Sequence, residues 1–359
     1  TSLAVNRGFF KAEQSAEEVS GQTLESFSKN SLLAVTEKQA QLYSVRLQDA
    51  AGLTVLAADY LENLHSAGAP SSLLDPANTV VEFSQLTASS SGLFYFDDNP
   101  GRRTEVIHVA NFPPDEATDR SLRDSSALDL LFPTLLRKID SGVAIYYQSP
   151  QFTLRYFPVI NLPEIVLKNG AIEAALAADP ADLPAGPAKD PDRKTIWLPP
   201  YLDSAGQGVV ASVQTPIYYG DEFSGYIGLD VALSKIIQQL NSLKPTENSF
   251  VFLLDQEGKL IAISPQDAQK IDSRGLTPPE GSLDSTLGLN LADLNPDLAQ
   301  VLTPVNPGQP ETYDAVLSGQ PVFITSAPLP DLDWRLSIVV PLAEVTNQAQ
   351  SVTRSIRED

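Results

Sequence analysis

The chain has 359 residues, of which 24 are basic and 45 are acidic, so its formal net charge is −21. This length favours two or three domains of roughly 150 residues each, and the negative charge argues against binding to nucleic acid or anionic lipid, whose phosphates it would repel. Because there is no cysteine, disulfides, thiolate metal sites and cysteine nucleophiles are excluded, while the compartment stays open on this evidence.

The first predicted element is a long helix over residues 1–66. From about its tenth residue it contains no proline and is rich in Ala, Leu, Glu, Gln and Ser, which favours helix. Leu53, Leu56 and Tyr60 follow one another at helical spacing and form a one-sided apolar stripe. Glycine and proline in "SAGAPSS" (66–72) then end the helix.

Residues 67–243 are predicted to form a first module, an antiparallel sheet flanked by helices. Strand-like runs occur at "TVVEFSQL", "GLFYFDD", "TEVIHVA" and "GVAIYYQSPQFTLRYFPVI", with the helical run "SSALDLLFPTLLRKI" among them. Residues 171–192 are dominated by Ala, Pro and Asp, and we expect a surface insertion there.

Residues 244–341 are predicted to form a second, smaller module of the same kind. "NSFVFLLDQEGKLIAISP" indicates a hairpin that turns at Asp255 to Gly258. "ETYDAVLSGQPVFITSAPLPDLDWRLSIVVPL" alternates like three antiparallel strands. The predicted fold class is therefore α+β, with two sheet modules attached to one long helix.

Residues 342–359 are predicted to be a C-terminal helix. Its apolar residues form a heptad seam, namely Leu342, Val345, Ala349, Val352 and Ile356. A seam of this length pairs only marginally, so we expect a monomer or a weak dimer. No run of about 18 apolar residues occurs, and because the chain starts at Thr1 and lacks methionine, we expect it to be part of a longer protein.

The candidate site lies in residues 197–233, "WLPPYLDSAGQGVVASVQTPIYYGDEFSGYIGLDVAL". Strand alternation places Tyr226, Gly228 and Asp230 on one sheet face and Phe223, Ile227 and Leu229 on the other. If residues 197–203 are extended, an aromatic wall and a carboxylate share a face, supplied by Trp197, Tyr201 and Asp203. Aromatic rings beside carboxylates are suited to binding an amine.

Structural interpretations of the same residues stay open. Asp203 begins "DSAGQG", where it can form an Asx-turn, and Asp230 can cap the following helix or lie solvated at a strand end. Trp197 and Tyr201 can be ordinary core aromatics.

Catalytic and metal sites find little support. There is no G-x-S-x-G, glycine-rich phosphate loop or H-E-x-x-H motif, although two acids can always converge in space as in a glycosidase. His65 and His108 have no His or Cys partner at ligand spacing, so we expect both to be structural. We expect no enzyme activity, no metal and no cofactor.

The order of these elements resembles the double Cache (dCache) family, the extracytoplasmic sensor domains of bacterial chemoreceptors, sensor kinases and related receptors. "WLPPYLD" is similar to the family's W-x-x-P-Y-x-D entry to the pocket, and "TPIYYGDEFSGYIGLDVAL" to its P-x-Y…G-x-x-G-x-D strand pair. "DWRLSIVVPLAEV" resembles the strand that closes the second module.

The resemblance implies which residues bind a ligand. The spacing of Asp203 and Asp230 matches the acidic residues that hold the ligand ammonium in the amino-acid-sensing subgroup. That subgroup grips the ligand carboxylate with an R-x-W-Y element, whose nearest match is Arg155 followed by Tyr156, with Pro158 where tyrosine is expected. An amine without a carboxylate, or some other ligand, therefore remains an alternative. The predicted ligand-binding residues are Arg155, Tyr156, Trp197, Tyr201, Asp203, Tyr226 and Asp230.

The resemblance also implies the role of the whole chain. Residues 67–243 would be the membrane-distal, ligand-binding module and residues 244–341 the membrane-proximal one, with both chain termini at the membrane pole of a receptor. A small molecule, with an amino acid or amine favoured, would be the partner, and the location would be periplasmic or extracellular. The alternatives are a free or lipid-anchored solute-binding protein, and a Cache ectodomain that acts through a protein partner or as a spacer.

Overall fold

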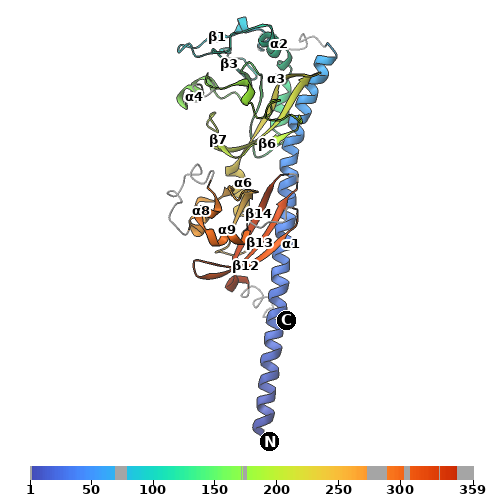
Figure 1. The fold of residues 1–359 in the computed structure, drawn as a ribbon, viewed down its shortest axis with the longest axis vertical. Coiled ribbons are helices and arrows are strands. Elements are labelled where there is room, and N and C mark those ends of the chain that lie inside the picture. The colour runs from blue at the N-terminus through green and yellow to red at the C-terminus, as the bar shows by residue number, and fades with distance from the viewer. Residues whose placement is uncertain are drawn as a thin grey trace. The chain divides into compact units, whose positions relative to one another are not determined.

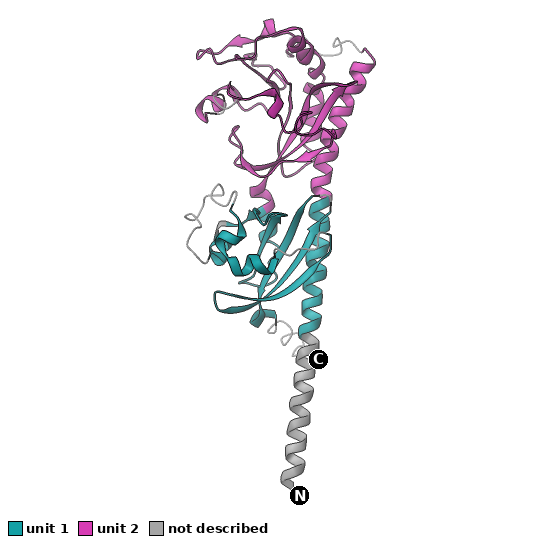
Figure 2. Ribbon diagram, in the orientation of Figure 1, with its two compact units in different colours: residues 1–44, 237–359 teal, residues 45–236 magenta. Residues whose placement is uncertain are grey.

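The computed structural model describes residues 2–68, 79–170, 172, 176–272, 289–302, 308–330 and 332–345, with side chains from residue 25 on. The chain divides into two compact units (Figure 2). Unit 2 consists of residues 45–236, and unit 1 of residues 1–44 together with 237–359. The helix α1 (Ser2–Ser66) contributes to both units.

Unit 2 is built on a 9-stranded antiparallel sheet (Figure 1) with the order β1-β2-β3-β5-β4-β9-β8-β6, and β7 also pairs with β8. The strands are β1 (Thr87–Ala88), β2 (Phe94–Phe96), β3 (Glu105–Val109), β4 (Gly142–Gln148), β5 (Thr153–Phe157), β6 (Ile196–Trp197), β7 (Tyr201–Leu202), β8 (Val209–Tyr219) and β9 (Glu222–Ala232). The helical elements are η2 (Phe83–Gln85), α2 (Glu116–Ser125), α3 (Leu128–Leu136), α4 (Leu162–Lys168) and η3 (Pro180–Asp182), and α6 (Leu233–Asn241) follows β9.

Unit 1 carries a 5-stranded antiparallel sheet with the order β11-β10-β14-β13-β12. Its strands are β10 (Phe250–Asp255), β11 (Leu260–Ile263), β12 (Glu311–Leu317), β13 (Gln320–Leu329) and β14 (Trp334–Pro341), and its short helices are α7 (Pro265–Ile271), α8 (Leu291–Leu294) and α9 (Pro296–Leu302). The predicted hairpin with its turn at Asp255 to Gly258 and the three final antiparallel strands are confirmed. The α+β fold class is thus confirmed.

Helix α1 packs through a face that its apolar stripe did not indicate. The buried residues around its C-terminal half are small or medium-sized, among them Thr54, Ala57 and Leu61, whereas Leu56 and Tyr60 of the predicted stripe are exposed. The Thr54 hydroxyl lies 2.7 Å from that of Thr215 on β8, and both are buried. In unit 1 the buried Thr36 hydroxyl lies 2.6 Å from that of Thr325 on β13. Small residues let the helix backbone approach each sheet closely, and these hydroxyl pairs satisfy buried polar groups.

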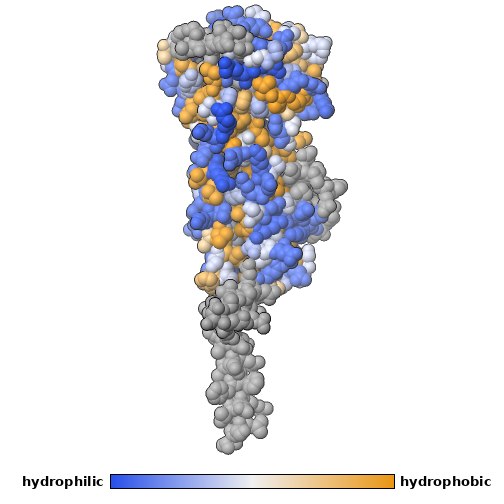
Figure 3. All heavy atoms as spheres, turned by 180° about the vertical axis from the view of Figure 1, so that it is seen from behind, coloured by the Kyte–Doolittle hydropathy of each residue, from blue (hydrophilic) through white to orange (hydrophobic). Residues whose placement is uncertain are grey.

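Several large apolar side chains of α1 remain exposed, namely Val35, Leu42, Val45, Leu56 and Tyr60. Figure 3 shows one face of the molecule, on which hydrophobic and hydrophilic residues are interspersed.

Among the described residues, no helix combines the length and the apolar character needed to cross a membrane. Of the predicted C-terminal helix, the structure describes only a helical turn at 342–345, so the rest of the heptad seam lies outside the described residues. The first residue and the last fourteen also lie outside them, so the predicted positions of the two termini are not tested.

A β-bulge changes the predicted alternation in β9. The register of β8 and β9 shifts between Ile217 and Tyr218, and Gly225 has a φ of 133°, which a side chain would strain. Because of the extra residue, Phe223 packs in the cluster that contains Tyr226. The prediction that Phe223 shares a face with Ile227 and Leu229 is therefore wrong, whereas Asp230 keeps the side predicted for it.

The stretch 171–192 is not only a surface insertion. Ile172, Leu183 and Ala185 are buried in the same cluster as Tyr146 and Tyr156. The sequence did not indicate that these residues are buried, because a few apolar side chains at irregular spacing in an Ala- and Pro-rich stretch show no helix or strand period.

We predict that Gly228→Ala destabilises unit 2 by about 1 to 3 kcal/mol, the usual cost of overpacking. A Cβ at this position would lie 2.3 Å from Cζ of the Tyr146 ring, which crosses the strand there. Urea unfolding followed by circular dichroism measures the change. The control is Gly52→Ala on the exposed side of α1, where a Cβ meets nothing within 4 Å, and where helix propensity predicts a gain of about 0.5 to 1 kcal/mol. Equal effects of both substitutions would contradict the packing argument.

Candidate functional site

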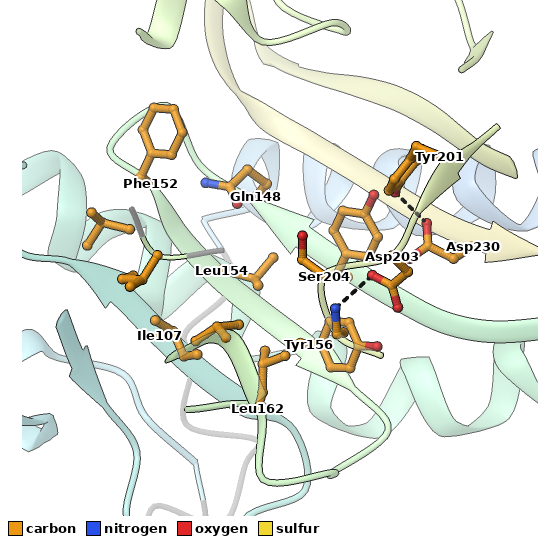
Figure 4. A pocket seen from close by; sticks show the side chains of 15 residues that line it. Ile107, Gln148, Phe152, Leu154, Tyr156, Leu162, Tyr201, Asp203, Ser204 and Asp230 are labelled. Atoms are coloured by element: carbon orange, nitrogen blue, oxygen red, sulfur yellow. Dashed lines mark hydrogen bonds between the residues drawn. The ribbon is translucent and has the colours of Figure 1, made fainter. Parts of the chain in front are cut away.

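Unit 2 contains a cavity of about 270 Å³ (Figure 4). Strands β3, β4, β5 and β9 form its floor, and helix α4 and the turn after β7 close over it. Most of its wall is apolar, supplied by Ile107, Val109, Phe152, Leu154, Leu162 and Val166. Concave and mostly apolar sites with a few placed polar groups are typical of small-molecule binding.

The acidic groups gather at one end of this cavity. Figure 4 shows Tyr201, Asp203 and Asp230 together at this end, with Phe152 and Ile107 at the other and Gln148 beside Phe152. The carboxylates thus lie at one end of the cavity, and mostly hydrocarbon with one neutral amide lies at the other.

Asp230 lies within β9, opposite Ser212 of β8, and only 2% of it is exposed. Its Oδ1 accepts a short hydrogen bond from the Ser212 hydroxyl and one of 3.4 Å from the Tyr201 hydroxyl. Burial and, to a smaller extent, the charge of the nearby Asp203 carboxylate raise the pKa of Asp230 to about 7, although the hydroxyl donors act to lower it. It is neither a helix cap nor a solvated strand end, which were the structural alternatives.

Asp203 forms a turn and also lines the cavity. Its carboxylate accepts hydrogen bonds from the backbone N–H of Ala205 (3.0 Å) and Gln207 (3.1 Å), which is the Asx-turn interpretation. It also lines the cavity, and burial raises its pKa. The turn fixes the carboxylate in place, so little side-chain freedom remains to be lost when a ligand binds.

Tyr156 presents an unsatisfied hydroxyl at the same end. The residue is 3% exposed, and its Oη has no hydrogen-bond partner among the described residues. Burial, followed by the charges of Asp203 and Asp230, holds its pKa well above the ordinary value, so it is a neutral phenol. A buried polar group without a partner costs free energy, and a ligand that bonds to it recovers that cost.

Tyr146, which the sequence did not indicate, completes this end of the cavity. Its ring is stacked against Tyr156 with a centroid separation of 6.2 Å, and Tyr226 meets it edge-on at 6.3 Å. Tyr146 pairs with Gly228 across β4 and β9, and the missing side chain at Gly228 leaves space for the ring. The signal that would have found Tyr146 is this pairing, which local periodicity cannot reveal.

Arg155 does not line the cavity. It is 1% exposed, and its Nη1 lies 2.6 Å from Oδ1 of Asp129 in a buried ion pair. Its remaining nitrogens donate to the Ser125 hydroxyl and to the carbonyls of Val80 and Leu122. Strand alternation explains the result, because neighbours on β5 point to opposite faces and Tyr156 faces the cavity.

Two other predicted residues lie near the cavity without lining it. Tyr226 is buried behind Tyr146, and Trp197 on β6 is partly exposed and outside the lining. The structure thus brings together Asp203, Asp230, Tyr201 and Tyr156. It adds Gln148 and Ser204 as polar lining residues; neither carries a pattern in the sequence that would have selected it.

The histidines take structural positions. Both ring nitrogens of the fully buried His108 are hydrogen-bonded, to the Thr153 hydroxyl and the Phe112 carbonyl. His65 stacks on Tyr219 at a centroid separation of 3.7 Å. Within the described ranges, no group of three or more His, Cys, Asp or Glu side chains is arranged to hold a metal ion.

Known proteins resemble the chain over most of its length. A family model described as "Cache domain" (dCache_1) matches residues 12–349. The extracellular domain of a putative histidine kinase, mmHK1S-Z3, superposes with a TM-score of 0.52 at 11% identity, covering 90% of this chain and 98% of that one. The ligand-binding domain of the Pseudomonas aeruginosa PAO1 amino acid chemoreceptor PctC, in complex with GABA, gives 0.50 at 18% identity, covering 87% and 99%.

A curated relative matches a shorter stretch. The methyl-accepting chemotaxis protein PscA of Pseudomonas syringae pv. tomato is 28% identical over 67 residues, which is 19% of this chain and 11% of that protein. This chain therefore corresponds to a small part of the relative's length.

We predict that Asp129→Ala destabilises the protein by about 3 to 5 kcal/mol, because it leaves the Arg155 guanidinium buried without a counter-ion. The matched control is Asp124→Ala, which removes a partly exposed partner of His65 at 3.3 Å and should cost about 1 kcal/mol or less. Chemical unfolding of both variants gives the comparison. Similar small losses would show that the Arg155 network contributes little to the fold.

We predict that the ligand-free protein loses stability between about pH 4 and pH 7 because of Asp230. Its pKa is raised to about 7 in the folded state from a reference of 3.8, so over this window the folded state holds a proton that the unfolded state has released. The contribution is present below the unfolded pKa and is lost as pH rises through the folded pKa, on the order of a few kcal/mol in all.

Asp230→Asn cannot titrate and should lack this component. Thermal melts of wild type and Asp230→Asn at matched pH values isolate it, with the variant gaining relative stability towards pH 8. Parallel stability curves for the two proteins would contradict the raised pKa.

Proposed function

The chain belongs to the Cache domain family dCache_1, and from this premise we propose that it is the extracytoplasmic, ligand-sensing domain of a membrane-anchored signal-transduction receptor. The family predicted from the sequence motifs is confirmed by the match over residues 12–349. The proposal adds what the family does not settle for this chain, namely that the cavity of unit 2 is the sensory site and that its ligand is an amino acid or an amine.

The observation that carries the proposal is the pair of acidic residues in the cavity. Asp230 is 2% exposed and Asp203 8% exposed, and both carboxylates have raised pKa values because of burial. Among the described residues that line the cavity, none is basic. Buried carboxylates without a counter-ion are costly to the fold, and they cluster where function requires them. A cationic ligand supplies the missing charge.

The proposed role is sensing and involves no chemical step. The cavity contains acids and phenols, but its lining includes no histidine, lysine, serine–histidine pair or metal group that would activate a nucleophile. Ligand binding would instead bias the domain between two conformations through its different affinity for each.

We predict that a screen of amino acids, amines, organic acids and purines identifies a ligand that raises the melting temperature. At one hundred times its Kd, a ligand stabilises the native state by about 2.7 kcal/mol, which corresponds to a shift of a few degrees. Asp230→Asn and Asp203→Ala should each weaken binding roughly ten- to a hundred-fold, since each removes a charge-assisted hydrogen bond.

The matched control is Asp221→Asn, because Asp221 is a fully exposed acid in the turn between β8 and β9 and should leave affinity unchanged. Isothermal titration calorimetry measures all three variants. A ligand that binds with undiminished affinity to both cavity variants would place the sensory site elsewhere and would contradict the proposal.

A further inference from the structure

The cavity also restricts the chemical class of the ligand, and this inference rests on the proposed function. We infer that the ligand is a primary amine with an apolar body and no carboxylate, so that the free amino acids are poor ligands. The inference depends on the charges that line the cavity, on the acceptors at its polar end and on the hydrocarbon at its other end.

The first step concerns what is missing from the cavity wall. A ligand carboxylate in a buried site is stabilised best by a cation, and none of the described lining residues is Lys, Arg or His. The neutral donors there, such as Ser204 and Gln148, bring no positive charge. The stretches of unit 2 that the structure does not describe, residues 69–78, 171 and 173–175, contain no basic residue either. Arg155, the residue expected to grip a carboxylate, is committed to Asp129 and to backbone carbonyls on the far side of β5.

The second step concerns the polar end, which offers acceptors. The carboxylates of Asp203 and Asp230 and the unpartnered Oη of Tyr156 all belong to this end of the cavity. A primary ammonium has three N–H donors and one positive charge, so it can satisfy three acceptors and compensate the carboxylates at once. A quaternary ammonium brings the charge without donors and would leave the Tyr156 hydroxyl unsatisfied.

An α-amino acid is disfavoured at the same end. In an α-amino acid the carboxylate is bonded to the same carbon as the ammonium group. Anchoring the ammonium therefore brings the ligand carboxylate close to Asp203 and Asp230. Like charges in a partly desolvated site repel strongly, because the local dielectric is low.

The third step concerns the other end of the cavity, which sets the body of the ligand. Phe152, Ile107, Val109 and Leu154 line it together with the neutral amide of Gln148, and Figure 4 shows Phe152 and Ile107 well away from the carboxylates. The cavity of about 270 Å³ lies just below the usual range of ligand pockets, about 300 to 1,000 Å³, so the ligand is a small one. An arylalkyl or branched alkyl amine has this size and this separation of polar and apolar ends.

The test uses two amines and the amino acids that carry the same side chains. 2-Phenylethylamine is compared with phenylalanine, and 3-methylbutylamine with leucine, by isothermal titration calorimetry on the whole chain. We expect at least one amine to bind, with its amino acid at least a hundred-fold weaker. 2-Phenylethanol, which has no charge, and N,N,N-trimethyl-2-phenylethylammonium, which has no donors, should both bind at least ten-fold more weakly than 2-phenylethylamine.

Variants separate the anchoring groups. Tyr156→Phe keeps the ring and removes only the hydroxyl, so it should weaken the primary amine several-fold and leave the trimethylammonium compound unchanged. Asp230→Asn should weaken both cations and leave 2-phenylethanol unchanged. Circular dichroism melts of the ligand-free variants show whether each one is folded.

The outcomes separate this inference from the proposed function. If phenylalanine or leucine binds as tightly as its amine, or if only the trimethylammonium compound binds, the inferred ligand class is wrong. If Asp230→Asn then loses that binding, the proposed function still holds, because the cavity is the binding site. If none of these compounds binds, the ligand class is wrong and the broader screen decides the proposed function. If a cationic compound binds equally well to wild type and Asp230→Asn, both proposals fail.

Discussion

The structure of unit 2 is organised around the desolvation of Asp230, a carboxylate in the interior of a sheet without a cation beside it. Its neighbours offset part of the cost, since the hydroxyls of Ser212 and Tyr201 both donate to Oδ1. Burial still dominates, and the pKa is raised to about 7. The free protein therefore bears a cost that an apolar residue at this position would avoid, and such costs persist where a site needs the group for binding.

Two buried polar side chains on opposite sides of strand β5, one charged and one neutral, differ in whether the protein itself satisfies them. Arg155 faces Asp129, Thr104 and Ser125, so its charge and donors are compensated by the protein itself. Tyr156, the next residue, faces the cavity and leaves its hydroxyl without a partner among the described residues. A compensated buried charge is part of the architecture, whereas uncompensated groups that converge in one cavity support the proposed ligand site. The contrast explains why an arginine that matches a family motif in position need not touch a ligand.

The sequence predicted those features that depend on local pattern. The long helix, the strand pairs and the two acids at the ends of 203–230 follow from residue periodicity and turn chemistry, and the structure has the helix and strands where these patterns put them. What failed depends on residues distant in the chain. The bulge at Gly225 added one residue and reversed the side of Phe223. The partner of Arg155 comes from α3, and the cavity wall from α4 and from Ile172, which no alternation connects to β9.

The position of the cavity on the sheet also connects it to α1. Asp230 and Ser212 are paired across β9 and β8, and their side chains point to the cavity face. Thr215, three residues further along β8, points to the opposite face, where its hydroxyl meets Thr54 of α1. The backbone of Tyr218 on the same strand donates to Glu62 of α1 at 2.8 Å. One strand thus carries both the serine that donates to Asp230 and the contacts that hold the helix. Under the proposed sensory role, a ligand that displaced Asp230 would act on α1 through this strand. Coupling of this kind needs no separate pathway, only a sheet with two arrangements to which the ligand binds with unequal affinity.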